Sequence, residues 1–288
     1  MPNMIELFKA CIPLLDEVYK LASLTSVLDG APELAKQGAN ANELIIPKID
    51  MSGLANYSRN DGYVRGDVTF TNETVMCNFD RGRMFSVDVL DDLETVRLAY
   101  GKLASEFIRT KVVPELDAFR LAKYAAKAGG KATGALSTGA AVIGALRAAI
   151  TEMDEKEVPA TERYLYITPT LHGLIEDLDT TKSKQVLSGF AGVIKTPQSR
   201  FYTEITQRDG KSEGQEAGGY AKAEGGKSVN FLIVHKPAVI QYQKHVAPKV
   251  ITPEANQSSD GYLVGYRNVG IADAYENKLD GIYAHDAG

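Results

Sequence analysis

Apolar and polar residues along the 288-residue chain form patterns that predict several separate elements. Near the start, apolar residues at positions 5, 8, 12, 15, 18 and 21 follow helical spacing and predict an amphipathic helix. Lysines and acidic residues interrupt this stretch, so it lacks the continuous apolar run of a signal peptide. Two strand-like segments follow at 43–51 and 67–89, separated by a polar stretch at 52–66. They predict a long hairpin arm.

The most regular helical pattern lies between residues 92 and 127. Apolar residues at 93, 96, 100, 103 and 107 recur at spacings of three and four, and helical character continues to Gly129. Pro114 falls inside this run and cannot donate a backbone hydrogen bond. We therefore expect a kink or a restart of the helix near Val113.

Both the predicted helix and the predicted arm are long for a chain of this size. A helix over 92–127 would extend about 54 Å, whereas a compact globule of 288 residues has a radius of gyration of about 19 Å. Two strands alone are only marginally stable in water, so the arm should lie on another surface. The sequence therefore predicts a flat, extended subunit that assembles with neighbours.

The remaining chain predicts a mixed α/β region without an internal repeat. Ser137 or Thr138 is suited to cap an alanine-rich helix over 139–153. A glycine-rich loop is expected over 209–228. The other expected elements are a strand at 164–168, a short helix at 170–178, a strand pair around 192–197 and 201–206, and strands at 231–234, 262–272 and 278–283.

Composition narrows the class of protein. With 44% apolar residues the bulk of the chain is expected to fold, and no run approaches the roughly 20 apolar residues that a membrane span needs. The net charge of −5 removes the usual electrostatic argument for a protein that wraps nucleic acid. Cys11 and Cys77 have no metal or redox spacing, so they are expected to be free thiols of a cytosolic product.

Candidate catalytic and metal-binding patterns are weak. Gly210–Gly214 matches the nucleophile pattern of serine hydrolases around Ser212, but it lacks the apolar strand and packed helix that this motif requires. Gly226-Lys227-Ser228 resembles the end of a phosphate-binding loop, but Ala221 stands where the first glycine is needed. The four histidines show no ligand spacing. We expect no catalytic, cofactor or metal site.

Several strings, in this order along the chain, resemble the major capsid proteins of tailed bacteriophages, the Hong Kong-97-like family. The most specific runs from Pro114 to Arg120 and carries Glu115, Asp117 and Phe119. The others lie at 78–88, 91–94, 163–169 and 277–283, so the resemblance spans nearly the whole chain.

The resemblance implies an α+β fold in five parts. These are an N-terminal arm (1–42), an extended hairpin loop (43–80), a peripheral domain with a spine helix (81–130), an axial domain (131–237), and a return of the peripheral domain with C-terminal strands (238–288). It further implies a structural subunit, not an enzyme, that self-assembles into the icosahedral head around double-stranded DNA.

The same resemblance implies partners and location. The subunit would form hexamers and pentamers with itself, use a separate scaffolding protein and a portal, touch packaged DNA only weakly and contact no membrane. It would be made in the bacterial host cytoplasm and end in the virion. The expected intersubunit contacts lie at the tip of the hairpin loop, where tyrosine and arginine suit interfaces: Tyr57, Arg59, Asp61, Tyr63 and Arg65.

Two other functions stay open at the level of sequence. A shell protein of an encapsulin-type cellular nanocompartment shares the fold but encloses cargo proteins. A hydrolase using Ser212 would be a different class of protein, and reaction with a serine-directed phosphonate would reveal it.

Overall fold

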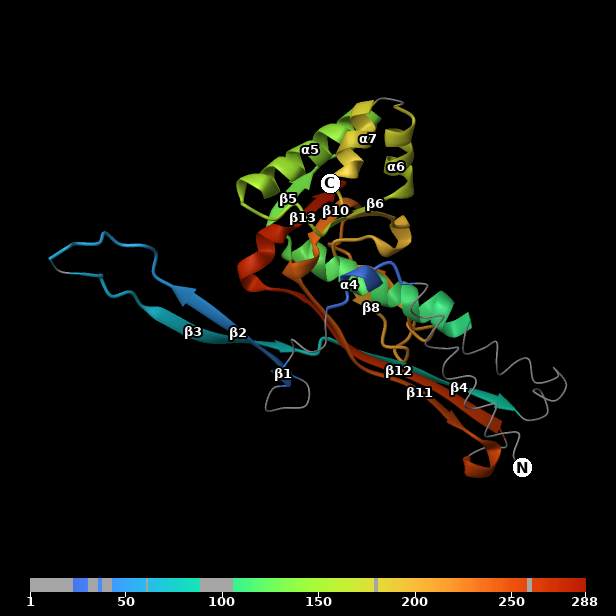
Figure 1. Cartoon of the computed structure of the whole chain (residues 1–288). Helices are drawn as coiled ribbons and strands as arrows, with labels where there is room; N and C mark the ends of the chain where they lie inside the picture. The colour runs from blue at the N-terminus through green and yellow to red at the C-terminus, as the bar shows by residue number, and fades with distance from the viewer. Residues whose placement is uncertain are drawn as a thin grey trace.

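The computed structural model of the chain describes residues 23–30, 36–37, 43–60, 62–88, 106–178, 181–257 and 261–288. It consists of an α/β body, a long sheet beside it, and a hairpin arm that projects from them (Figure 1). This is the mixed α+β architecture predicted from the sequence. None of the described helices is long and apolar enough to cross a membrane.

The body is built on a five-stranded sheet of order β5-β13-β10-β6-β7. Both neighbours of the central β10 run antiparallel to it, whereas the two edge strands pair in parallel. The last strand of the chain therefore enters a sheet formed mostly by residues 130–235. The strands are β5 (Gly130–Thr133), β6 (Arg163–Ile167), β7 (Gly192–Lys195), β10 (Val229–His235) and β13 (Ile282–Asp286).

Helices cover both faces of this sheet because successive strand residues point to opposite sides. Leu165 and Ile233 face one side, where they pack under helices α5 (Gly139–Glu155), α6 (Pro169–Glu176) and α7 (Thr181–Ser188) (Figure 1). Tyr166 and Leu232 face the other side and pack with helix α4 (Val113–Lys127) in a second core. The body is thus a three-layer sandwich.

Helix α5 follows the sequence prediction closely. Of the two expected caps, Thr138 is the one used, because its Oγ1 accepts a hydrogen bond from the backbone N–H of Ala141 at 3.2 Å. The strand at 163–167 and helix α6 also match the predicted segments to within two residues at each end. Helix α7 was not predicted, since Val186 and Leu187 are the large apolar residues of its eight and form no periodic pattern.

The spine helix carries the expected irregularity. A π-helical turn, Ile108–Val112, precedes α4, and the N–H of Val113 donates to the carbonyl of Ile108 five residues earlier. Pro114 follows directly in the first turn of α4, so the break expected near Val113 is confirmed as a widened turn. The first part of the predicted helix, 92–105, and the predicted helix near the N-terminus lie outside the described residues.

A second sheet, of order β11-β12-β4, corrects one strand prediction. The single strand expected over 67–89 is wrong: β3 (Val68–Met76) belongs to the arm, and β4 (Phe79–Asp88) pairs with β12 (Gly261–Ala274). Between them, the Asn78 side chain donates to the carbonyl of Ala272 at 2.8 Å and accepts from its N–H at 3.1 Å. Asn78 thereby takes the place of a ladder residue where the chain changes sheets. The outer strand is β11 (Val239–Ile251).

Two further expectations differ from the structure. The predicted loop 209–228 contains strand β9 (Tyr220–Lys222), which pairs with β8 (Ile205–Gln207), so the segments near 192–197 and 201–206 do not pair with each other. The strand expected from 278 begins only at Ile282, because the preceding residues form the 3₁₀ segment Glu276–Gly281. Short runs with mixed polarity gave no periodicity that could separate these alternatives.

Buried charge fixes the segment 23–30 to the spine helix. Asp117 on α4 is fully buried, and its carboxylate accepts from Ser23 Oγ (2.8 Å), Leu24 N (3.0 Å), Thr25 Oγ1 (2.8 Å) and Thr25 N (3.3 Å). Arg200 forms an ion pair with the same carboxylate at 3.3 Å. One turn later, Arg120 donates to Thr25 Oγ1 at 2.9 Å. The charged residues of the 114–120 run therefore form a structural junction.

Candidate assembly surface

The arm is a regular antiparallel hairpin. Strand β2 (Glu43–Met51) pairs with β3 along its whole length, from Glu43 opposite Met76 to Met51 opposite Val68. The predicted first strand is confirmed at both ends. A short strand, β1 (Lys36–Gln37), adds to the base, and the far end projects away from the body (Figure 1).

The two faces of the arm differ in polarity. Directly opposed residues of an antiparallel pair share a face, so Ile49 with Phe70 and Met51 with Val68 form two adjacent apolar pairs on one side. The opposite side carries alternating residues of the same strands, which are polar along the middle of the arm: Lys48, Asp50, Thr69, Thr71 and Glu73. A hairpin with one apolar face is built to be covered on that face.

The apolar face is uncovered in the isolated chain. Phe70 is 74% exposed and Met51 is 61% exposed. Of the eleven large hydrophobic side chains that are exposed in the described part of the chain, nine lie on the arm: Ile49, Met51, Leu54, Tyr57, Tyr63, Val64, Val68, Phe70 and Met76. Contiguous exposed apolar surface of this kind marks an interaction site.

The tip holds the contact residues predicted from the sequence. Tyr57 and Tyr63 meet across the tip with ring centroids 4.9 Å apart, and they are 60% and 87% exposed. Arg59 and Arg65 are also exposed, so the structure places four of the five predicted residues on one solvent-facing loop. Asp61 lies outside the described residues. The loop reverses at Gly62, whose φ of 77° suits glycine and which exchanges backbone hydrogen bonds with Ser58.

Polar contacts in the middle of the arm and apolar contacts at its base attach it to the rest of the chain. Lys48 Nζ lies 2.9 Å from a carboxylate oxygen of Glu73 and 2.6 Å from one of Glu276 in the C-terminal region. Hydrogen bonds to Glu276 and Glu73 raise the pKa of Lys48 above its ordinary value. On the same face Val75 packs with Ile240 and Ile271. Among the described residues the arm is thus attached from its base to Lys48, whereas the large apolar side chains of its outer half are exposed.

Ser212 does not have the environment of a catalytic serine. Its Oγ donates to the Asp209 carboxylate, which also accepts from the N–H groups of Lys211 (2.8 Å) and Ser212 (2.9 Å). Strand β8 ends at Gln207, before this exposed turn, and further turn residues follow Ser212 in place of the packed helix that the hydrolase motif requires. Among the described residues, no three His, Cys, Asp or Glu side chains are grouped to hold a metal ion.

Comparison with known proteins shows which proteins share this fold. No known family model matches the sequence, and no curated protein matches it. Solved structures do match, with 97 matching chains. A chain of the mature capsid of bacteriophage PhiM1 aligns with TM-score 0.58 at 14% identity, covering 87% of this chain and 83% of that one. A chain of Gordonia phage Cozz aligns with TM-score 0.61 at 10% identity, covering 93% of this chain and 86% of that one.

A third match comes from outside the phages. The virus-like particle from Pyrococcus furiosus aligns with TM-score 0.53 at 11% identity, over 93% of this chain and 98% of that chain. Each of these alignments covers most of both chains, and this agreement identifies the fold. The chain has the Hong Kong-97-like capsid fold. The implied division of the chain into peripheral and axial domains stays a prediction.

Within the capsid fold, sequence reasoning missed the central part of the candidate surface. The tip was predicted, but the apolar pairs of Ile49 with Phe70 and Met51 with Val68 were not. Their signal is present as alternation with threonine in Val68-Thr69-Phe70-Thr71. Alternation alone does not show whether the apolar face is covered by the same chain or by another.

The turn at Ser212 gives a prediction that separates a structural from a catalytic role. Hydrogen bonds from Ser212 Oγ and from the backbone N–H groups of Lys211 and Ser212 lower the pKa of Asp209 to about 2. We expect Ser212→Ala to raise this pKa towards the ordinary value of 3.8. The pKa of Asp209 is lower in the folded state than its ordinary value, so the ionised carboxylate stabilises the turn above pH 3.8. This stabilisation is lost as the pH falls towards 2. NMR titration of the Asp209 carboxyl carbon measures its pKa in the wild type and in Ser212→Ala. Equal pKa values in the two proteins would show that the Ser212 hydroxyl does not stabilise the carboxylate.

Proposed function

We propose that this chain is the structural subunit of an icosahedral shell, the head of a tailed bacteriophage that encloses double-stranded DNA. The observation that carries the proposal is the apolar face of the arm, exposed on a chain with the capsid fold. In a single chain, Phe70 and its apolar neighbours are exposed to water. In a complete shell, a neighbouring subunit would cover the apolar face of each arm.

Assembly would proceed by many weak contacts. The apolar face of the arm would lie over the neighbouring subunit, and Tyr57, Arg59, Tyr63 and Arg65 would contact it from the tip. Complete burial of a large apolar side chain contributes about 1.5–3 kcal/mol. One arm contact is therefore modest, but a closed shell repeats it in every subunit, and each added contact is made at a high effective concentration.

The proposal includes partners and a location that the fold does not specify. The subunit would form hexamers and pentamers, assemble with a separate scaffolding protein and a portal, and function without catalysis. It would be made in the host cytoplasm and become part of the virion. With five negative charges in excess, its contact with packaged DNA would be weak overall.

One observation favours a second candidate function. The match to the virus-like particle from Pyrococcus furiosus covers almost all of both chains. An encapsulin-type nanocompartment, which would enclose cargo proteins in place of a genome, is therefore the alternative. The two functions differ in what the shell contains.

We expect purified protein, alone or with a scaffold partner from the neighbouring genes, to form hollow shells visible by electron microscopy. Shells isolated from the natural source should contain DNA, which absorbance at 260 nm and nuclease-resistant electrophoresis would detect. Protein cargo without DNA would support the nanocompartment. A stable monomer at high concentration with every scaffold partner would contradict both shell functions.

A further inference from the structure

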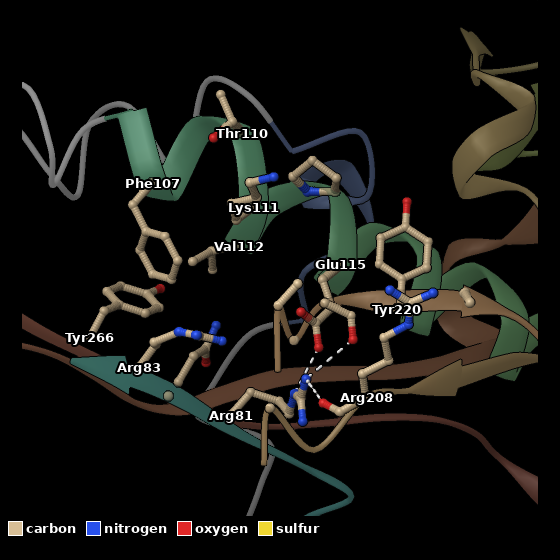
Figure 2. A pocket seen from close by; sticks show the side chains of 18 of the residues that line it. Arg81, Arg83, Phe107, Thr110, Lys111, Val112, Glu115, Arg208, Tyr220 and Tyr266 are labelled. Carbon is tan, nitrogen blue, oxygen red and sulfur yellow. Dashed lines mark hydrogen bonds and ion pairs between the residues drawn. The ribbon is translucent and has the colours of Figure 1, made fainter. Parts of the chain in front are cut away.

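A cavity of about 850 Å³ lies between the spine helix and the second sheet, away from the arm. Strands β4 and β12 form one wall, the start of the spine helix forms another, and the β8–β9 region closes one end. Figure 2 shows Phe107 and Tyr266 at one end, Arg208 and Tyr220 at the other, and Arg81 with Glu115 between them. This is the size of a pocket for a small organic ligand.

Strand pairing places chemically different side chains on one cavity wall. Arg81 on β4 is directly opposite Asn268 on β12, and Arg83 is opposite Tyr266. Residues two apart on a strand share a face, so these two pairs lie next to each other. The wall therefore combines two guanidinium groups, a phenol ring and an amide.

The cavity has an excess of positive charge. Each carboxylate that lines it is already bound: Glu115 to Arg81 at 2.7 Å, Glu106 to Arg109 at 2.7 Å, and Asp209 to Ser212. By contrast, four lining cations have no carboxylate partner in the part of the chain that the structure describes: Arg83, Lys111, Arg208 and Lys222. The Arg83 guanidinium donates to the backbone carbonyl of Glu216 at 2.9 Å. On a chain with net charge −5, this is a local site for an anion.

A buried amide faces the same cavity without a partner. Asn268 is 1% exposed and lines the cavity, yet neither its Nδ2 nor its Oδ1 has a hydrogen-bond partner among the described residues. Leaving a buried polar group unpaired is unfavourable, so this amide is available to pair with a group that enters the cavity. An amide offers an NH₂ donor group and a carbonyl acceptor side by side.

Aromatic rings form the end of the cavity near Asn268. Phe107 contacts Phe85 edge-on with centroids 4.7 Å apart, and Tyr266 lies 6.4 Å from Phe107 in a similar orientation. All three rings line the cavity, so a flat group that enters it meets aromatic side chains there. Stacking on aromatic side chains is a common way to hold a nucleobase.

From these features we infer that the cavity binds a nucleoside phosphate, either free or at an exposed position of a nucleic acid strand. Arg83, Lys111, Arg208 and Lys222 neutralise the phosphates, the aromatic end holds the base, and Asn268 pairs with the base edge. An acidic peptide side chain fits less well, because an ionised carboxylate only accepts hydrogen bonds and leaves Asn268 Oδ1 unpaired. A base edge with an adjacent donor and acceptor satisfies both atoms, as asparagine does with adenine.

The test is equilibrium binding to the full-length protein at low salt, measured by fluorescence anisotropy. The probes are labelled deoxyadenosine triphosphate and a labelled five-nucleotide single-stranded DNA, with inorganic triphosphate and hexaglutamate as competitors. We expect the nucleotide to bind at least about tenfold more tightly than inorganic triphosphate, because the base adds stacking and the Asn268 contact. Binding of the strand but not of the free nucleotide would assign the site to nucleic acid, within the same chemistry.

Variants locate the binding in this cavity. The double variant of exposed Lys111→Ala with half-buried Arg208→Ala should weaken nucleotide binding about 100-fold, since two charge-assisted contacts are lost. Arg147→Ala, which removes an exposed arginine from helix α5, is the matched control and should leave binding unchanged. Asn268→Ala should reduce the preference for nucleotide over triphosphate. Equal binding by the double variant, or binding of hexaglutamate alone, would overturn the inference. This assay needs no shell, so its result is independent of the proposed assembly.

Discussion

Replacing Phe70 by lysine is expected to leave the subunit folded and to prevent shell assembly. Phe70 is 74% exposed on the apolar face of the arm, so the lone chain loses little when the ring is removed. In a shell the same position would be covered, and burial of a large apolar side chain contributes about 1.5–3 kcal/mol. Each contact would weaken by roughly 10- to 100-fold, and a charge would have to be desolvated as well.

The effect multiplies because the contact recurs in every subunit. Sedimentation velocity at a concentration where the wild type is mostly in shells should show Phe70→Lys almost entirely as small species. Thr69→Lys is the matched control: it adds the same charge one residue away, on the polar face and opposite Asp50. That variant should assemble like the wild type. Normal shells from Phe70→Lys would show that this face is not the assembly surface, and failure of both variants would point to a general effect of charge on the arm.

The arm illustrates how far the sequence alone can lead. The strand 43–51 and the polar tip could be predicted because strand-forming residues end sharply at turn-forming ones. Exposure of the apolar face could not, because alternation such as Val68-Thr69-Phe70-Thr71 normally means that the apolar face packs on the same chain. Only the three-dimensional arrangement shows that the body lies elsewhere.

The break between β3 and β4 had no local signal for a different reason. No glycine or proline separates Met76 from Phe79, and β-forming residues continue on both sides. The break is fixed by the Asn78 side chain and its two hydrogen bonds to Ala272, which is 194 residues away. By contrast, Pro114 marks the irregularity of the spine helix within its own segment, and that prediction was confirmed.

The candidate cavity was equally hidden. Arg81 and Asn268 are directly opposed only through the register of β4 and β12. Arg208 reaches the same cavity because β9 folds the glycine-rich segment back onto β8. These residues are distant in sequence and each has an ordinary local context, so no motif could connect them.

Asp117→Asn is expected to cause a large loss of stability. The carboxylate is fully buried. It accepts hydrogen bonds from three residues of the 23–30 segment and forms an ion pair with Arg200. An amide of the same shape presents an NH₂ group to at least one of these donors, and it leaves the Arg200 charge without its partner. Breaking a buried charged network by removing one member costs about 3–5 kcal/mol. For a chain of this size that corresponds to a fall in Tm of roughly 10 °C.

The matched control for this substitution is Asp80→Asn, which removes the same charge from a surface ion pair. Asp80 and Arg267 lie 2.6 Å apart, but their side chains are 51% and 60% exposed, and exposed pairs contribute about 0–1 kcal/mol. Thermal unfolding followed by circular dichroism should therefore separate the two variants clearly. Equal Tm values would mean that the Asp117 network is replaceable. A low Tm for Asp117→Asn, together with faster hydrogen exchange in residues 23–30, would show that this carboxylate holds the segment on the spine helix.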